Sequence, residues 1–123
     1  MKFARIVFLI AGAWGFAILT PLYFTYDLVG RSYPPAITHP DFYYGFVGVT
    51  LVWQLAFLII ATNPVRYRAV MLAAILEKLV YVTTMVTLYL QGQLQVGQVA
   101  VAGPDLILAL LFIAAFLKTP HQG

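Results

Sequence analysis

The sequence predicts an all-α protein, an integral membrane antiparallel four-helix bundle with both termini in the cytoplasm. Three observations favour this fold class. Of the 123 residues, 63% are hydrophobic and only 9% are charged, whereas a soluble domain averages about 45–50% apolar and about 25% charged residues. The mean hydropathy is +0.92. The hydrophobic residues also fall into four runs that are each long enough to span about 30 Å of hydrocarbon.

The four predicted spans form a single membrane domain, and the segment 25–41 is predicted to be an external lid loop. The spans cover approximately residues 4–24, 42–62, 69–90 and 99–117. Continuous runs of this length favour helices, because strands of a membrane barrel alternate apolar and polar residues over about 10 positions. Short connections between the spans predict that neighbouring helices are antiparallel.

Positive charges predict the orientation of the spans. Five basic residues fall on one side of the four-span arrangement: Lys2, Arg5, Arg66, Arg68 and Lys118. Arg31 falls on the other side. Because cytoplasmic segments carry the excess of Lys and Arg, both termini are expected in the cytoplasm, and the membrane is expected to be a plasma or inner membrane. The basic residues form no patch or stripe, so nucleic acid is excluded as a partner.

The start of the chain fits a second interpretation. Lys2 and Arg5 precede an apolar stretch, as in a signal peptide. No small-x-small cleavage site follows cleanly, and Tyr23, Phe24 and Tyr26 instead resemble an interfacial anchor. We therefore expect the first run to be retained as a span.

Three ionisable residues lie inside the predicted spans, where a charge is expensive to insert. Glu77 and Lys78 lie near the middle of the third span, and Asp105 lies at a similar depth in the fourth. We predict a structural ion pair between Lys78 and Asp105. Neighbours on a helix do not face each other, so Glu77 is expected to lack a basic partner and to face the interior together with Tyr81. The charges fix the helix register only, line a polar pocket for a ligand or proton, or contact another subunit.

Five residues are candidate ligand-binding residues: Asp27, Trp53, Gln54, Glu77 and Tyr81. Trp53 and Gln54 lie in mid-span, where an amide requires a hydrogen-bond partner, and they form either one wall of a cavity or a contact between helices. Asp27 lies at the end of the first span, within an aromatic and proline-rich segment that is expected to cover the mouth of the bundle.

Small residues suggest where helices approach closely. Ala11 and Gly15 form one small-xxx-small pair, and Ala69 and Ala73 form another. Such pairs allow backbones to come together in membranes, although glycine and alanine are also common in membrane helices without such a role.

Several chemistries are excluded by the residues present. There is no cysteine, which excludes disulfides, thiolate metal sites and thiol redox catalysis. Neither histidine lies in a predicted span, and His39 with Asp41 supplies too few ligands for a metal site. No HExxH, P-loop or GxSxG motif occurs. The sequence therefore assigns no catalytic residue and no metal site, predicts no cofactor, and favours a non-enzymatic role.

Three stretches resemble the EXPERA family, which includes emopamil-binding-protein-like four-helix membrane proteins. Pro21 followed by Asp27-Leu28 is similar to the end of the first helix in that family, LVWQLAFLIIAT (51–62) is similar to its second helix, and NPVRYR (63–68) resembles its basic loop. The resemblance implies a compact bundle that binds sterols or cationic amphiphiles, and in some members isomerises a sterol. Thr50 stands where relatives carry an acid, and Glu77-Lys78 has no counterpart.

These observations predict a protein whose intramembrane cavity binds a lipophilic ligand, such as a lipid, a sterol-like molecule or an isoprenoid. An alternative is an accessory subunit of a larger membrane complex, because a small chain with almost no part outside the membrane suits that role. A third possibility is a proton-coupled transporter that assembles as a dimer. The expected partners are membrane lipids, with other membrane subunits or a second copy of the chain as alternatives.

Overall fold

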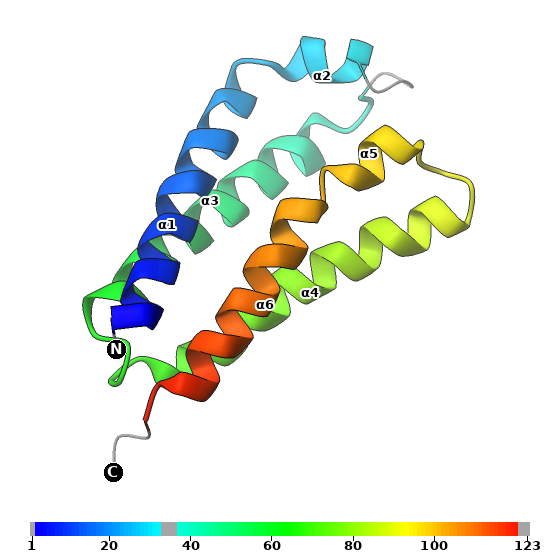
Figure 1. Cartoon of the computed structure of the whole chain (residues 1–123). Coiled ribbons are helices and arrows are strands. Elements are labelled where there is room, and N and C mark those ends of the chain that lie inside the picture. The colour runs from blue at the N-terminus through cyan, green and yellow to red at the C-terminus, as the bar shows by residue number, and fades with distance from the viewer. Residues whose placement is uncertain (1, 33–36, 121–123) are drawn as a thin grey trace.

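The computed structural model describes residues 2–32 and 37–120, and every regular element in them is helical (Figure 1). The elements are α1 (Lys2–Leu19), the 3₁₀ helix η1 (Thr20–Tyr23), α2 (Tyr26–Ser32), α3 (Pro40–Thr62), α4 (Arg68–Leu90), α5 (Val96–Ala100) and α6 (Gly103–Lys118). Part of the predicted lid loop, residues 33–36, lies outside the described residues, as does His121.

Four helical segments are long and apolar enough to cross a membrane: Lys2–Tyr23, Pro40–Thr62, Arg68–Leu90 and Val96–Lys118. Each agrees with a predicted span to within a few residues. For residues 2–32 and 37–120 the structure thus confirms an all-helical fold with four apolar segments of membrane-spanning length, because a helix of this size is about 30 Å or more long.

Two of the four segments are not continuous α-helices, a feature that the hydrophobic runs did not predict. The first passes from α1 into η1, where Pro21 removes a backbone N–H and favours the tighter turn. The last is divided into α5 and α6 just before Gly103 and Pro104. Glycine is a poor helix former, and proline is tolerated only in the first turn of a helix, so a new helix begins at this point.

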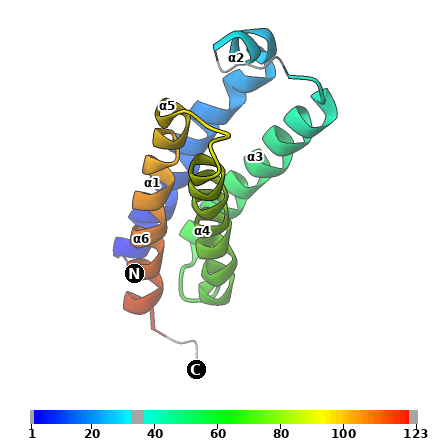
Figure 2. The ribbon, with the colours of Figure 1, turned by 90° about the vertical axis from the view of Figure 1, so that its right-hand side faces the viewer.

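The helices meet closely at one end of the molecule and separate toward the other. α1 packs chiefly against α3 and α6, and α4 packs chiefly against α6. The start of α1, the end of α6 and the connection between α3 and α4 lie at the same end (Figure 1). From that connection α3 and α4 diverge, as both views show (Figures 1 and 2).

The packed core lies at the end where the helices meet. The Phe8 and Phe112 rings stack at a centroid distance of 4.4 Å, and Phe57 packs edge-on to Phe112 at 5.0 Å. All three side chains are fully buried, and alanines of all four long segments surround them. In lipid, helix association depends on van der Waals packing rather than on the hydrophobic effect, so this cluster is the main contact that holds the helices together.

Glycines on α1 allow that helix to lie very close to α3. A Cβ atom at Gly12 would lie 2.5 Å from Leu58 Cδ2, and one at Gly15 would overlap the Gln54 side chain. The predicted small pair Ala11 and Gly15 is buried at this contact.

The second predicted small pair, Ala69 and Ala73, does not lie at a close contact between helices. Ala69 is exposed, and Ala73 borders an outward-facing groove between α3 and α4 rather than a tight helix contact.

Two arginines at the closely packed end bind carbonyl groups at the ends of neighbouring helices. Arg5 Nε donates to the Ala61 carbonyl at 3.1 Å, and Arg68 Nε donates to the Thr119 carbonyl at 2.7 Å. The last carbonyls of a helix lack partners within it and carry partial negative charge. These guanidinium groups therefore stabilise the ends of α3 and α6.

Aromatic side chains attach the α2 segment to the start of α3. Tyr26 donates its hydroxyl to the Ile37 carbonyl at 3.0 Å, and Tyr43 donates to the Leu22 carbonyl at 2.7 Å. The Tyr26 ring also stacks on Tyr44 at 5.5 Å. Desolvation and the neighbouring Tyr44 raise the pKa of Tyr26 above its ordinary value.

Candidate functional site

A cavity of about 450 Å³ lies in the half of the molecule where the helices separate. Its walls come from α1, η1, α3, α4, α5, α6 and the short link between α5 and α6. The lining residues are Trp14, Gly15, Ile18, Leu19, Leu22, Phe46, Thr50, Gln54, Glu77, Lys78, Tyr81, Gly97, Ala100, Val101, Pro104 and Asp105. Most of them are apolar, and the polar members gather on the facing sides of α3, α4 and α6.

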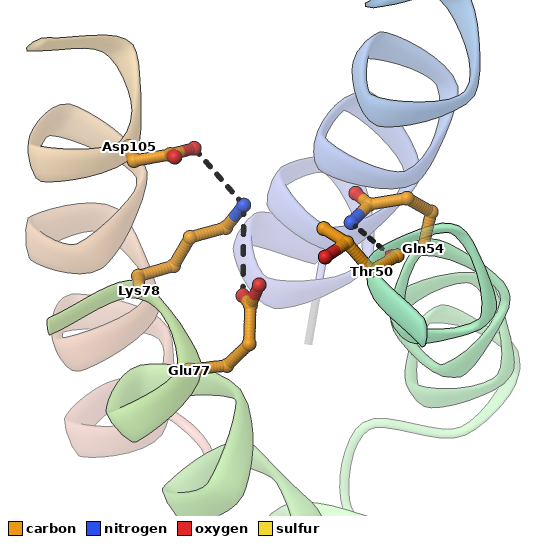
Figure 3. Close-up of polar contacts among 5 residues, drawn as sticks. All are labelled: Thr50, Gln54, Glu77, Lys78 and Asp105. Carbon is orange, nitrogen blue, oxygen red and sulfur yellow. Dashed lines mark hydrogen bonds and ion pairs between the residues drawn. The ribbon is translucent and has the colours of Figure 1, made fainter. Parts of the chain in front are cut away.

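Lys78 lies between two carboxylates on the α4 and α6 side of the cavity (Figure 3). Its Nζ atom lies 3.0 Å from Asp105 Oδ1 and 3.6 Å from Glu77 Oε2. The first contact is the ion pair expected from the depths of the two residues. The ammonium also lies 5.2 Å from the centroid of the Phe57 ring. Lys78 is buried, so its charge is balanced within the protein.

The expectation that Glu77 has no basic partner is wrong, because Lys78 approaches it as well. Adjacent residues leave a helix about 100° apart, but the long flexible lysine stem brings its charged end back toward its neighbour. Two carboxyl groups therefore share one ammonium. With all three groups ionised, the cluster carries a formal charge of −1.

Asp105 is held by the break between α5 and α6. It lies in the first turn of α6, directly after Gly103 and Pro104. A helix N-terminus carries partial positive charge and favours a carboxylate there. This support was not predicted, because hydropathy alone indicates one helix over residues 99–117. The Gly103-Pro104 pair was the available signal.

Gln54 faces the charged cluster from α3 across the cavity (Figure 3). Its side chain is only 1% exposed. Nε2 donates to the Thr50 carbonyl at 2.9 Å. Its Oε1 atom is buried and accepts no hydrogen bond from any residue that the structure describes. A buried amide oxygen without a donor is unfavourable by about 1–3 kcal/mol, so this atom is an open acceptor.

Glu77 supplies a second open acceptor. Its Oε2 atom is buried and, within residues 2–32 and 37–120, has no hydrogen-bond donor. The 3.6 Å separation from Lys78 is an ionic contact that is too long for a hydrogen bond. Gln54 and Glu77 therefore line opposite walls of the cavity, and each carries one buried oxygen that has no donor among the described residues.

Tyr81, one turn beyond Glu77 on α4, also lines the cavity. Its ring stacks on Phe46 of α3 at a centroid distance of 6.2 Å. Gln54, Glu77 and Tyr81 are therefore three predicted ligand-binding residues that the structure brings to one cavity.

Trp53 and Asp27 do not line this cavity, contrary to expectation. Trp53 precedes Gln54 and so points about 100° away from it; its ring lies 6.4 Å from Phe57 and borders grooves on the outside of α3. Asp27 is exposed on α2 and borders a separate hollow with Tyr26 and Arg31. The sequence placed Trp53 at the level of Gln54, but it could not fix the direction of the Trp53 side chain.

The described residues offer no metal site, since no three His, Cys, Asp or Glu side chains among them lie close enough to hold an ion. What the site can do chemically is to accept hydrogen bonds inside an apolar enclosure. Comparisons with protein-family models, with curated proteins and with solved structures find no match, so the resemblance to the EXPERA family stays a prediction from the sequence motifs.

Proposed function

We propose that this chain is a multi-pass protein of a plasma or inner membrane whose four spans form an antiparallel bundle, with both termini in the cytoplasm. The four apolar segments support the membrane location. The orientation rests on the basic residues at the end of the molecule where α1 begins and α6 ends, since positive residues favour the cytoplasmic side.

We further propose that the cavity binds a lipophilic ligand, a lipid, a sterol-like molecule or an isoprenoid. The observation that carries this proposal is the buried, unpartnered Gln54 Oε1 in a mostly apolar cavity of about 450 Å³. Ligand pockets are typically apolar enclosures of about 300–1,000 Å³ with a few polar groups that orient the ligand. A polar atom of the ligand would satisfy the acceptor that the protein leaves open.

Each polar residue has a distinct part in this proposal. Gln54, Glu77 and Tyr81 contact the polar group of the ligand. The Lys78–Asp105 pair holds α4 to α6 and fixes the position of the Glu77 carboxylate. The apolar wall residues of α1 and α5 enclose the remainder of the ligand.

The test is to reconstitute the purified protein in lipid nanodiscs and to identify the lipophilic molecules that it retains. Gln54→Leu removes the open acceptor while keeping a similar side-chain volume. A ligand site predicts that this variant loses the retained molecule, while its melting temperature stays equal to or above that of the ligand-free wild type, because an unsatisfied buried group has been removed.

Gln93→Leu is the matched control, because it makes the same change at an exposed glutamine in the loop between α4 and α5. It should retain the ligand. If Gln54→Leu folds and still retains the same molecules, the open acceptor does not bind a ligand and the ligand-binding proposal is wrong. Co-purification of a second polypeptide in fixed ratio, with no lipophile in the cavity, would favour the accessory-subunit alternative.

A further inference from the structure

The cavity adjoins an apolar groove that opens on the outside of the protein between α3 and α4. The groove has a volume of about 510 Å³. Phe46, Glu77 and Tyr81 line both the cavity and the groove. The cavity and the groove are therefore adjacent, with these three side chains at the boundary between them.

The walls of the groove suit a hydrocarbon chain. Trp53 borders it on α3, and Leu76 and Val80 border it on α4. Ala73 lies at the same groove and leaves space that a larger side chain would fill. At the junction with the cavity, the Phe46 and Tyr81 rings stack at a centroid distance of 6.2 Å. These rings narrow the junction, and a flexible chain fits beside a narrow junction more readily than a rigid fused ring system does.

The polar end of the cavity selects the chemistry of the head group. Its open atoms are acceptors, Gln54 Oε1 and Glu77 Oε2, and both are buried. The Lys78 ammonium is engaged by Asp105, by Glu77 and by the face of Phe57. A head group that donates hydrogen bonds matches these atoms. A carboxylate or phosphate head would add acceptors and negative charge beside two carboxyl groups.

We propose that the ligand is a single-chain amphiphile with a hydrogen-bond-donating head, a hydroxyl or an ammonium. The head lies between Gln54 and Glu77, and the chain leaves through the groove between α3 and α4. This inference rests on the proposed function, because it names the ligand class for the same cavity.

The experiment uses the full-length chain in phosphatidylcholine nanodiscs and three photoreactive probes with the same chain, analogues of hexadecanol, hexadecylamine and palmitic acid. We expect saturable labelling by the alcohol probe, by the amine probe or by both, and about tenfold weaker labelling by the acid probe. Either donor probe supports the proposal, and comparison of the two distinguishes a hydroxyl from an ammonium head. Cross-links should map to α3 and α4 near Ala73.

Ala73→Trp fills the groove and should abolish labelling, and Ala73→Leu serves the same purpose if the tryptophan variant does not fold. Ala17→Trp, at an exposed position of α1, is the matched control and should label as the wild type does. The inference is overturned if the acid labels as strongly as the alcohol and the amine, if cross-links map away from α3 and α4, or if folded groove variants label normally. If a sterol or isoprenoid occupies the cavity and all three probes fail to label the protein, this inference is wrong but the proposed function stands. If no lipophilic molecule occupies the cavity, the proposed function is wrong as well.

Discussion

Lys78 is the residue whose removal should destabilise this fold most through electrostatics. Lys78→Met keeps a side chain of similar length but leaves Asp105 and Glu77 without the ammonium that lies 3.0 and 3.6 Å away. Removing one partner of a fully buried ion pair costs about 3–5 kcal/mol. The Glu77 and Asp105 side chains are 18% and 25% exposed, and this residual exposure reduces the penalty. We therefore expect a loss of about 2–3 kcal/mol in the free energy of unfolding.

The assay is reversible unfolding in mixed micelles with increasing dodecyl sulfate, followed by helical circular dichroism. Lys2→Met is the control, since it removes an exposed lysine at the start of α1 and should change stability by less than about 0.5 kcal/mol. The double variant Lys78→Met with Asp105→Leu should recover part of the loss, because a buried ion pair is often replaceable by apolar residues. A Lys78→Met protein within about 0.5 kcal/mol of wild type would refute the reasoning, since it would mean that the carboxylates do not depend on this ammonium.

Three further outcomes follow from the packing and the proposed orientation. Gly15→Ala should destabilise by about 1–3 kcal/mol, because the new Cβ overlaps Gln54, whereas Gly45→Ala meets open space and should be neutral or stabilising in the same unfolding assay. Tyr43→Phe loses the hydrogen bond to Leu22 and should reduce stability by about 0.5–1.5 kcal/mol, with faster amide exchange in α2. Because the chain has no cysteine, cysteines introduced singly at Ser32 and Arg66 report orientation: an impermeant maleimide added to intact cells should label the first only, and the opposite pattern would contradict cytoplasmic termini.

The number and extent of the apolar helices could be predicted because hydrophobic length is a local property of the sequence. The two interruptions could not be predicted from hydropathy, because Pro21 and Gly103-Pro104 are themselves compatible with apolar runs. Their effect depends on backbone hydrogen bonding rather than on composition.

The depth of the candidate site residues along their helices could be predicted, but the direction of their side chains could not. Helical rise places Lys78 and Asp105 at one level from their positions alone, and the structure places them in contact. The rotation of each helix about its axis depends on packing with its neighbours, so sequence did not reveal that Gln54 faces the cavity while Trp53 faces outward. The shared use of Lys78 by Glu77 depends on a side-chain conformation that spacing does not encode.

The separation of the phenylalanine cluster from the cavity has a consequence for how this protein tolerates change. The buried hydrophobic cluster lies near the two termini, and none of its described core residues lines the cavity. Substitutions at positions such as Ile18 or Val101 can therefore reshape the enclosed space with little loss of folding. A protein with this arrangement can acquire a preference for a different ligand while the phenylalanine cluster that holds its helices together stays unchanged.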